Sequence, residues 1–375
     1  MDIFFLSLLF LSVIYTLLLI YLQNSIMRCK SATVRHRPFI SIVVSMHNEE
    51  KNVRDCLEKL TAQDYPASKL EILPVDDRST DLTATILADY EKKYTQIRVI
   101  TVDEVPQDEA PKKFAISRAI SRARGSIILL TDADGRPPAT WAAQMISHFD
   151  KKTGMVIGYA PYLSSLPYHS LIFRLLALEY FSHAAVAAAT TCLGYPLTCV
   201  GTNMAYRKDV FDQLGGFGNY LSIHTGDDDL FLQRVREETD WQIAYCPEPA
   251  GQVWNAPPLS WHQFYHQRLR YASKGFHYPL RVTLTLVLFY IYNLLLFISP
   301  WFLLLDSGFF WYWLTAVVLK AAADYLLVVK AARYLQDQRH LLLFPFAFLL
   351  HIPYVLIFGL LSQLKSFEWA QRKSS

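Results

Sequence analysis

The stretch ILLTDADGRPP, residues 128–138, starts as an apolar run and ends abruptly in acidic residues. Asp132 and Asp134 stand one residue apart, and Gly135 with the two prolines behind it ends any regular element. Two carboxylates at this spacing repel each other, so their charge has to be balanced. Taken alone, the stretch fits a solvated turn as well as a cation site. The flanking sequence is needed to distinguish these two interpretations.

The sequence around this stretch alternates between strand and helix patterns. Apolar runs that break into polar residues are typical of buried parallel strands, and segments with apolar residues at helical spacing separate them. This alternation predicts βαβ units and therefore an α/β fold with a mostly parallel sheet. The expected strands are 40–44, 70–77, 97–103 and 126–134, and the expected helices are 49–62, 81–94 and 112–123.

Acidic side chains follow three of these strands. Glu49 comes after the first strand, Asp76 and Asp77 end the second, and Asp132 and Asp134 end the last. Because ligands bind beyond the carboxyl ends of parallel strands, we expect these residues to line one crevice. The sequence has neither a G-x-G-x-x-G nor a G-x-x-x-x-G-K-[ST] phosphate loop. Mg²⁺ or Mn²⁺ on these carboxylates is therefore the expected way to hold a diphosphate.

The composition indicates membrane segments. The chain has 375 residues, of which 52% are hydrophobic and 18% charged, whereas soluble domains average about 25% charged residues. Residues 3–22 carry no charge, and about 20 such residues span a bilayer. No basic region precedes this run, and it is longer than the core of a signal peptide. We therefore expect a retained transmembrane anchor at residues 1–27.

Basic residues set the expected orientation. Arg28, Lys30, Arg35 and Arg37 follow the anchor, and the positive-inside rule places the section after them in the cytoplasm. We expect an integral membrane protein, of a bacterial inner membrane, whose catalytic domain at 38–254 is cytoplasmic. The net charge of +3 and the lack of a basic stripe interleaved with aromatics argue against a nucleic-acid partner.

A second apolar block predicts a C-terminal transmembrane region at 280–364. Its runs lie at 282–305, 309–329 and 341–363. Pro353 interrupts the last run, and the tail behind it is basic, which favours the cytoplasmic side. A single crossing and a hairpin around Pro353 both remain open.

Two further segments are expected to lie at the membrane surface. Residues 164–190 are apolar but contain Arg174, Glu179 and His183, and a charge at the bilayer centre costs about 2.5–3.5 kcal/mol. An in-plane helix is therefore expected there. Residues 255–278 predict an interfacial amphipathic helix, with Arg268 at its surface or on lipid headgroups.

Six further motifs lie between residues 75 and 271. They are VDDRSTD (75–81), PKKFAISRAI (111–120), TDADG (131–135), GTNMAYRKDVFDQLGGF (201–217), GDDDLFLQRV (226–235) and QRLRY (267–271). These motifs occur in the order seen in family 2 glycosyltransferases, and the resemblance covers roughly 38–275. The sequence is most similar to the membrane-integrated members, namely ceramide glucosyltransferase and the hyaluronan and cellulose synthases. The resemblance implies a GT-A nucleotide-sugar-binding fold, Rossmann-like and mostly parallel.

The resemblance also implies roles for individual residues. Asp134 would bind Mg²⁺ or Mn²⁺ with the help of Asp132, and Asp228 would be the catalytic base. The alternative for Asp228 is that it caps the helix that follows it. Substrate contacts are expected from Glu49, Asp76, Asp77, Lys112, Asp132, Asp227, Gln267, Arg270 and Tyr271.

The sequence departs from the family pattern at two positions. Tyr271 stands where Q-x-x-R-W has tryptophan, which keeps an aromatic platform but puts its fit to the acceptor or the nucleotide in doubt. Ser117 stands where the segment beginning at Lys112 usually has asparagine.

These residues predict an inverting hexosyltransferase. A separate base activates the acceptor hydroxyl, and a single displacement inverts the anomeric centre. The expected donor is a nucleotide sugar, UDP-linked by resemblance, and the expected acceptor is a membrane lipid at the cytoplasmic face. The alternative is a processive polysaccharide synthase with a glycan acceptor. A non-catalytic scaffold would lack a metal or base carboxylate, and both are present as Asp134 and Asp228.

Overall fold

The computed structural model describes residues 1–29, 36–163, 170–364, 368–369 and 372–373. The predicted cytoplasmic cations Lys30 and Arg35 lie outside the described residues, as does the start of the predicted in-plane segment. The chain divides into two compact units, which we call the helical unit and the sheet unit. The helical unit comprises Met1–Arg28, Ser164–Leu193 and Pro257–Ser375, and the sheet unit comprises Cys29–Leu163 and Gly194–Ala256.

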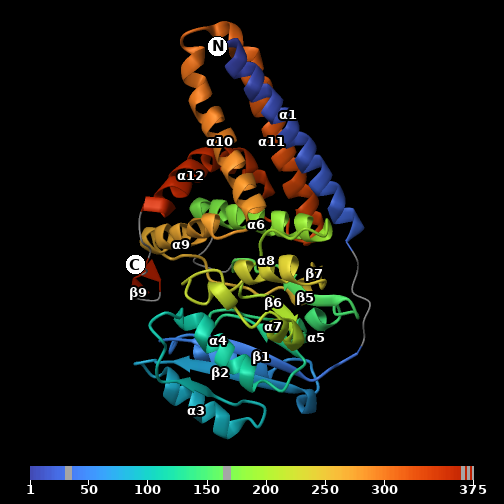
Figure 1. Ribbon diagram of the computed structural model, residues 1–375, viewed down its shortest axis with the longest axis vertical. Coiled ribbons are helices and arrows are strands. Elements are labelled where there is room, and N and C mark those ends of the chain that lie inside the picture. The colour runs from blue at the N-terminus through green and yellow to red at the C-terminus, as the bar shows by residue number, and fades with distance from the viewer. Residues whose placement is uncertain (30–35, 164–169, 365–367, 370–371, 374–375) are drawn as a thin grey trace. The chain divides into compact units, whose positions relative to one another are not determined.

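The sheet unit is built on seven strands in the order β3-β2-β1-β4-β6-β5-β7 (Figure 1). Only β6 runs antiparallel to its neighbours, β4 and β5, and the other pairings in this sheet are parallel. The predicted α/β fold with a mostly parallel sheet is therefore confirmed. The strands are β1 Ile40–Met46, β2 Leu70–Asp77, β3 Ile100–Val102, β4 Ile127–Leu130, β5 Thr153–Gly158, β6 Met204–Arg207 and β7 Gln242–Cys246.

Helices cover this sheet and bury its apolar runs. All eight residues of β2 are buried, and six of the seven in β1, which explains why both strands read as nearly continuous apolar runs. Leu57 of α2, Leu87 of α3 and Trp141 of α5 pack into one core with these strands. The helices of the sheet unit are α2 Val53–Thr61, α3 Thr83–Lys93, α4 Pro111–Arg122, α5 Trp141–Ile146, α7 Lys208–Gln213 and α8 Asp229–Glu238.

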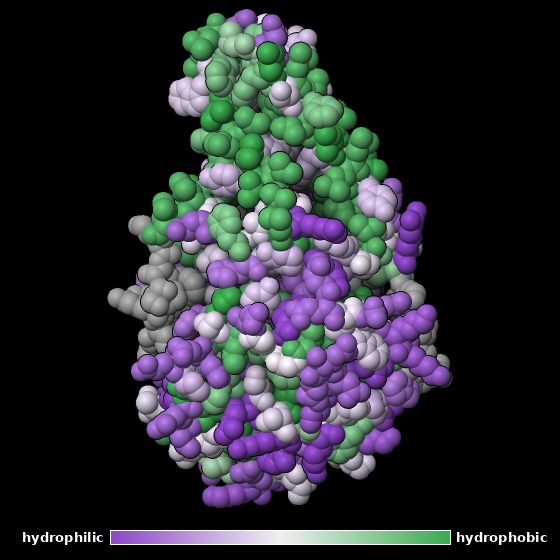
Figure 2. Space-filling view, in the orientation of Figure 1, coloured by the Kyte–Doolittle hydropathy of each residue, from purple (hydrophilic) through white to green (hydrophobic). Residues whose placement is uncertain are grey.

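The helical unit consists of long apolar helices. In Figure 1, α1, α10 and α11 run roughly alongside one another, and Figure 2 shows hydrophobic side chains covering their outer surface. Such a surface suits hydrocarbon rather than water. Its helices are α1 Asp2–Ser25, α6 Leu171–Cys192, α9 Trp261–Ser273, α10 Leu280–Leu303, α11 Phe310–Tyr334 and α12 Phe344–Leu364.

Among the residues that the structure describes, four helices are long and apolar enough to cross a membrane: Asp2–Arg28, Leu171–Cys192, Leu280–Leu303 and Leu341–Leu364. The predicted anchor and C-terminal runs thus form helices, while their passage through a bilayer and its direction stay predictions. The composition of Leu171–Cys192 also permits a span, but α6 lies crosswise to α1, α10 and α11 within the helical unit (Figure 1). That orientation favours the in-plane placement.

The helix α12 distinguishes between the single crossing and the hairpin that the sequence leaves open around Pro353. It runs without a break from Phe344 to Leu364 and has Pro353 in its interior. The hairpin around Pro353 is therefore wrong. Proline removes one helical hydrogen bond and bends a helix, but neighbouring turns hold the backbone in register.

Candidate functional site

The candidate site begins where parallel strands end together. Met46, the last residue of β1, is paired with Asp76 of β2, and β4 runs parallel to β1 on its other side. The loops after these three strands therefore leave the sheet at the same edge, as the βαβ pattern predicts. We call this part of the sheet unit the acidic edge, because it carries Glu49, Asp76, Asp77, Asp132 and Asp134.

Hydrogen bonds join the loop after β1 to the loop after β2. The amide of Glu49 donates to Thr83 Oγ1 at 2.8 Å, and the amide of Glu50 donates to Asp81 Oδ2 at 3.0 Å. Asn48, in the left-handed region at φ 56°, accepts the amide of Thr80 at 2.8 Å. These contacts hold the backbone on which Glu49 is displayed.

Asp76 and Asp77 are buried at the end of β2, with 6% and 2% of their surface exposed. The Oδ1 of Asp77 accepts from Arg78 Nε at 2.9 Å, and the Oδ1 of Asp76 accepts the Ser79 amide at 3.3 Å. Both carboxylates are thus oriented by their own loop. Their predicted contact with a nucleoside stays a prediction.

Lys112, at the start of α4, joins two of the predicted motifs. Its Nζ lies 2.8 Å from Asp132 Oδ1 and 2.8 Å from Asp227 Oδ2. Burial disfavours the charge on Lys112, but the two carboxylates outweigh burial and raise the pKa of Lys112. Proline at the first helical position, Pro111, fixes where α4 begins and so where this lysine stands.

The remaining acids of this edge form a cluster of negative charge. Burial raises the pKa of Glu49, and the negative charges of Asp134 and Asp132 raise it further, against a hydrogen bond from Asn52 that lowers it. Clustered carboxylate oxygens that repel one another are the donors that Mg²⁺ and Mn²⁺ take. The residues present therefore fit the predicted divalent cation, with Asp134 and Asp132 as its expected ligands.

Gly135 lets the loop that carries Asp132 and Asp134 pass close to Thr131 and Thr202. A Cβ at this position would lie 2.5 Å from Thr131 Oγ1 and 2.9 Å from Thr202 Oγ1. The amide of Asp132 donates to Thr202 Oγ1 at 3.4 Å. Sequence reasoning missed this supporting role of Thr202. The GTN segment at 201–203 was its only signal.

Three adjacent acids lie at the start of α8, and their surroundings differ. Asp227 contacts Lys112, and Asp229 is buried. Asp228 caps the helix, since its Oδ1 accepts the Asp229 amide at 2.7 Å. Its Oδ2 accepts the Gly201 amide at 3.1 Å. The capping interpretation therefore holds for Asp228, and it is compatible with a base, because each carboxylate oxygen keeps a second lone pair.

The motif QRLRY lies on α9 in the helical unit, so Gln267, Arg270 and Tyr271 are described within that unit only. The guanidinium carbon of Arg270 lies 5.2 Å from the ring centroid of Tyr271. Cation and aromatic ring are close enough to attract each other.

Arg268 of α9 corrects a prediction. Its side chain is fully buried and forms an ion pair at 2.5 Å with Glu179 of α6, so it is not a surface or headgroup contact. The hydroxyl of Tyr354 on α12 donates to the same carboxylate at 2.8 Å. Glu179 therefore ties α6, α9 and α12 together. The sequence could not pair residues 89 positions apart.

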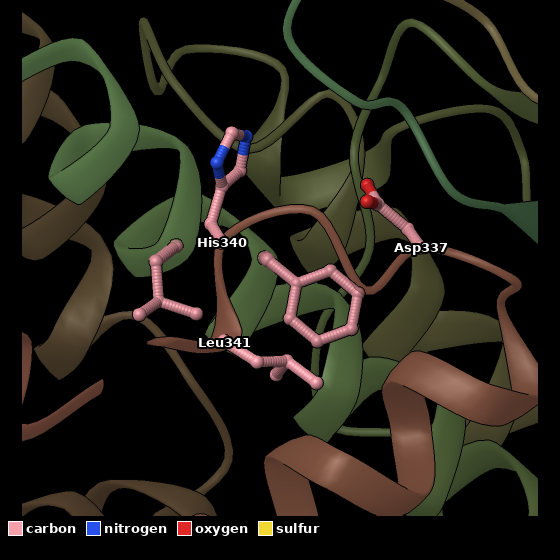
Figure 3. Close-up of a pocket in the computed structure, with 5 residues that line it drawn as sticks. Asp337, His340 and Leu341 are labelled. Carbon is pink, nitrogen blue, oxygen red and sulfur yellow. The ribbon is translucent and has the colours of Figure 1, made fainter. Parts of the chain in front are cut away.

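A cavity in the helical unit lies between α6 and the loop before α12. Its volume is about 10 Å³, and Leu178, Phe181, Asp337, His340 and Leu341 line it (Figure 3). A volume of this size holds one water molecule at most. The cavity is therefore not a substrate site.

Comparison with known proteins finds a likeness to one family. Residues 41–215 match the family described as "Glycosyl transferase family 2". This part of the chain, just under half of its length, is therefore similar to that family. Its curated relatives include the "Probable glycosyltransferase YdaM" of Bacillus subtilis, 25% identical over 242 residues, which are 64% of this chain and 56% of the relative.

A second relative and one solved structure extend the comparison. The "Beta-monoglucosyldiacylglycerol synthase" of Nostoc sp. is 26% identical over 242 residues, 64% of this chain and 49% of the relative. The chain thus spans about half the length of these relatives. The mannosyltransferase PcManGT from Pyrobaculum calidifontis, solved in complex with GDP-Man and Mn²⁺, superposes with a TM-score of 0.62 at 19% identity. It covers 97% of this chain and 98% of its own, which confirms the GT-A fold.

Proposed function

We propose that this protein is a family 2 glycosyltransferase that transfers a hexose from a UDP-linked sugar to a membrane lipid, with inversion at the anomeric carbon. The observation that carries the proposal is the contact of Lys112 with both Asp132 and Asp227. It joins three motifs, those around Lys112, Asp134 and Asp228, that lie far apart in the sequence. Sugar transfer needs a cation that neutralises the leaving diphosphate and a base that takes the proton of the acceptor hydroxyl. Lys112 and a metal ion would supply the positive charge, and Asp228 would supply the base.

The donor would bind along the acidic edge. Asp76 and Asp77 would accept hydrogen bonds from the nucleoside, and Glu49 would assist from the neighbouring loop. A divalent metal held by Asp134 and Asp132 would neutralise charge on the leaving diphosphate. The ammonium of Lys112, already placed between two carboxylates, would turn towards the same phosphates and add its charge.

The acceptor hydroxyl would lose its proton to Asp228. Two backbone amides, those of Gly201 and Asp229, fix the carboxylate of Asp228 in one orientation. A base held this way needs no reorganisation when the acceptor arrives. A base distinct from the metal ligands supports a single displacement, so an α-linked donor would give a β-linked product.

A lipid acceptor is supported by the helical unit. Its apolar outer surface suits a bilayer, and one relative is named a β-monoglucosyldiacylglycerol synthase. We propose that Gln267, Arg270 and Tyr271 of the amphipathic helix α9 also contact the substrates. The catalytic domain would face the cytoplasm, as the basic residues after α1 predict.

The second candidate is a processive polysaccharide synthase. The sequence Q-R-L-R-Y at 267–271 favours it, because it resembles the motif of such synthases. Against it stand the few helices available to one chain for an export channel. The four candidate spans of the described residues are the helices that contain α1, α6, α10 and α12.

The test is a screen of nucleotide sugars with the purified chain in lipid nanodiscs. We expect one donor to give a lipid-extractable product whose mass exceeds that of the acceptor by one hexose. Nuclear magnetic resonance of this product should show a β-linkage. A ladder of water-soluble polymer would exclude the lipid acceptor in favour of the synthase, and an α-linkage would exclude inversion.

A further inference from the structure

A second group of ligand-type side chains lies in the sheet unit, and none of its members belongs to the acidic edge. His148 follows α5, Cys246 ends β7, and Glu248 precedes the short helical turn Pro249–Gly251. One ligand atom of each lies within 4.8 Å of the other two. The imidazole Nε2 of His148 is 2.9 Å from Glu248 Oε2, and Cys246 Sγ is 3.4 Å from the same oxygen.

We propose that His148, Cys246 and Glu248 bind a zinc ion. In a tetrahedral zinc site with bonds of about 2.0–2.3 Å, neighbouring donor atoms stand roughly 3.3–3.6 Å apart. The separations of 2.9 and 3.4 Å from Glu248 Oε2 are close to that spacing. A ring nitrogen of His148 lies within 4.8 Å of Cys246 Sγ, so the three donors would close around the ion. Nitrogen, sulfur and oxygen donors together suit zinc, whereas the carboxylates of the acidic edge suit Mg²⁺ or Mn²⁺.

Burial supports a site that excludes most solvent but stays accessible on one side. The side chain of His148 is 2% exposed and that of Glu248 is 31% exposed. Cys246 is fully buried. Three protein ligands leave a fourth position of a tetrahedral ion, which water can reach beside Glu248.

The thiol is held where a thiolate ligand would be needed. A Cβ at Gly251 would lie 2.4 Å from Cys246 Sγ, so glycine allows the backbone to pass directly over the sulfur. Burial raises the pKa of Cys246, and the negative charge of Glu248 raises it further. Zinc would reverse this balance by binding the thiolate and releasing its proton.

Zinc here would fasten the segment that pairs with the loop after Asp134. The backbone of Trp254, eight residues beyond Cys246, exchanges hydrogen bonds with Arg136 at 2.8 and 3.2 Å. The hydroxyl of Thr140 donates to the carbonyl of Ala250 at 3.0 Å. A metal bridge between α5 and this segment would therefore stabilise the base of the acidic edge. This role does not depend on the reaction proposed above.

The test uses the full chain in detergent, stripped with a chelator and then given Co²⁺ as a spectroscopic substitute for Zn²⁺. We expect a sulfur-to-cobalt charge-transfer band and, after zinc loading and gel filtration, about one tightly held zinc per chain. Both should disappear in Cys246→Ser and persist in the matched control Cys199→Ser, which alters another buried cysteine of the sheet unit. Asp134→Ala should keep the band, because a carboxylate site cannot produce it.

Two results would overturn the proposal. One is the absence of a cobalt–thiolate band in the wild-type chain, which would leave a metal-free hydrogen-bonded triad. The other is a band that survives in Cys246→Ser, which would place the metal elsewhere. If that variant does not fold, His148→Gln, checked by circular dichroism, serves in its place and should lower zinc retention at least tenfold.

Discussion

Both units of the molecule place a cation against carboxylates, but the two arrangements differ in access. At the acidic edge, the side chains of Lys112, Asp132 and Asp227 are 18%, 36% and 12% exposed. In the helical unit, the side chains of Arg268 and Lys320 are fully buried, while those of their partners Glu179 and Asp324 are 14% and 17% exposed. A partly exposed cation can exchange its partners for a ligand, whereas a fully buried cation has a structural role. The exposure of the cation, and not its charge alone, therefore distinguishes the candidate site from a structural ion pair.

Breaking the ion pair of Arg268 and Glu179 should give the largest effect. Arg268→Met should lower the free energy of unfolding by about 3–5 kcal/mol, because it leaves the partly buried Glu179 without its guanidinium partner. Thermal unfolding in detergent measures this. The double variant Arg268→Met/Glu179→Gln should recover much of the loss. A single variant as stable as the wild type would show that the pair does not hold α6 to α9.

A substitution in the ion cluster of Lys112, Asp132 and Asp227 should lower activity more than stability. Lys112→Met should leave stability within about 1 kcal/mol of the wild type, as partly exposed ion pairs do. It should reduce sugar transfer by roughly 10²–10³-fold, because one preorganised charge at the leaving group is lost. Transfer rates and melting temperatures measured on the same preparation separate the two effects. Lys112→Arg, which keeps the charge, is the matched control.

Metal should stabilise the acidic edge and leave the ion pair of Arg268 and Glu179 unaffected. Mn²⁺ at about 100 times its dissociation constant should add about 2.7 kcal/mol to the stability of the sheet unit. Asp134→Asn should abolish that gain and also make the metal-free protein more stable, because one repelling charge is gone. Differential scanning fluorimetry with and without Mn²⁺ gives both numbers. An undiminished Mn²⁺ response in Asp134→Asn would remove this residue from the metal site.

The pH dependence of Glu49 is the smallest effect. Its pKa is raised in the folded chain, by burial first and then by Asp134 and Asp132. The fold therefore holds this proton more tightly than the unfolded chain does. The stability it contributes is full below the ordinary pKa and is lost as the pH rises through the raised one. Glu49→Gln should flatten this fall and gain about 1 kcal/mol or less at pH 7. Melting temperatures between pH 4 and 7 test it, and equal curves would contradict it.

Much of the sheet and the acidic edge follows from local sequence. Runs such as 40–46 and 70–77 are buried on both faces, so they read as apolar strands that end in polar residues. Parallel pairing then brings their carboxyl ends together without further information. The contact of Lys112 with Asp227 could not be predicted this way, because β6 inserts antiparallel between β4 and β5 and α8 follows it.

The helical unit was harder to predict than the sheet. Apolar length identified α1, α10 and α12, but length says nothing of how helices pair. Arg268 looked exposed because arginine is rarely buried unless it is paired, and its partner Glu179 lies on a helix far away in the sequence. Pro353 looked like a hairpin signal, yet the flanking turns keep α12 continuous. Tertiary pairing decided both cases, and local patterns do not report it.

The central claim is that the acidic edge transfers sugar with Asp228 as base. The most direct measurement is transfer of a radiolabelled hexose by wild-type and Asp228→Asn chains in matched nanodiscs, together with UDP binding by calorimetry. The asparagine keeps the size of the side chain and one acceptor oxygen for the cap. We predict that transfer falls by at least about 10³-fold while UDP binding stays within a few-fold. Transfer at the wild-type rate in Asp228→Asn would contradict the role of Asp228 as base.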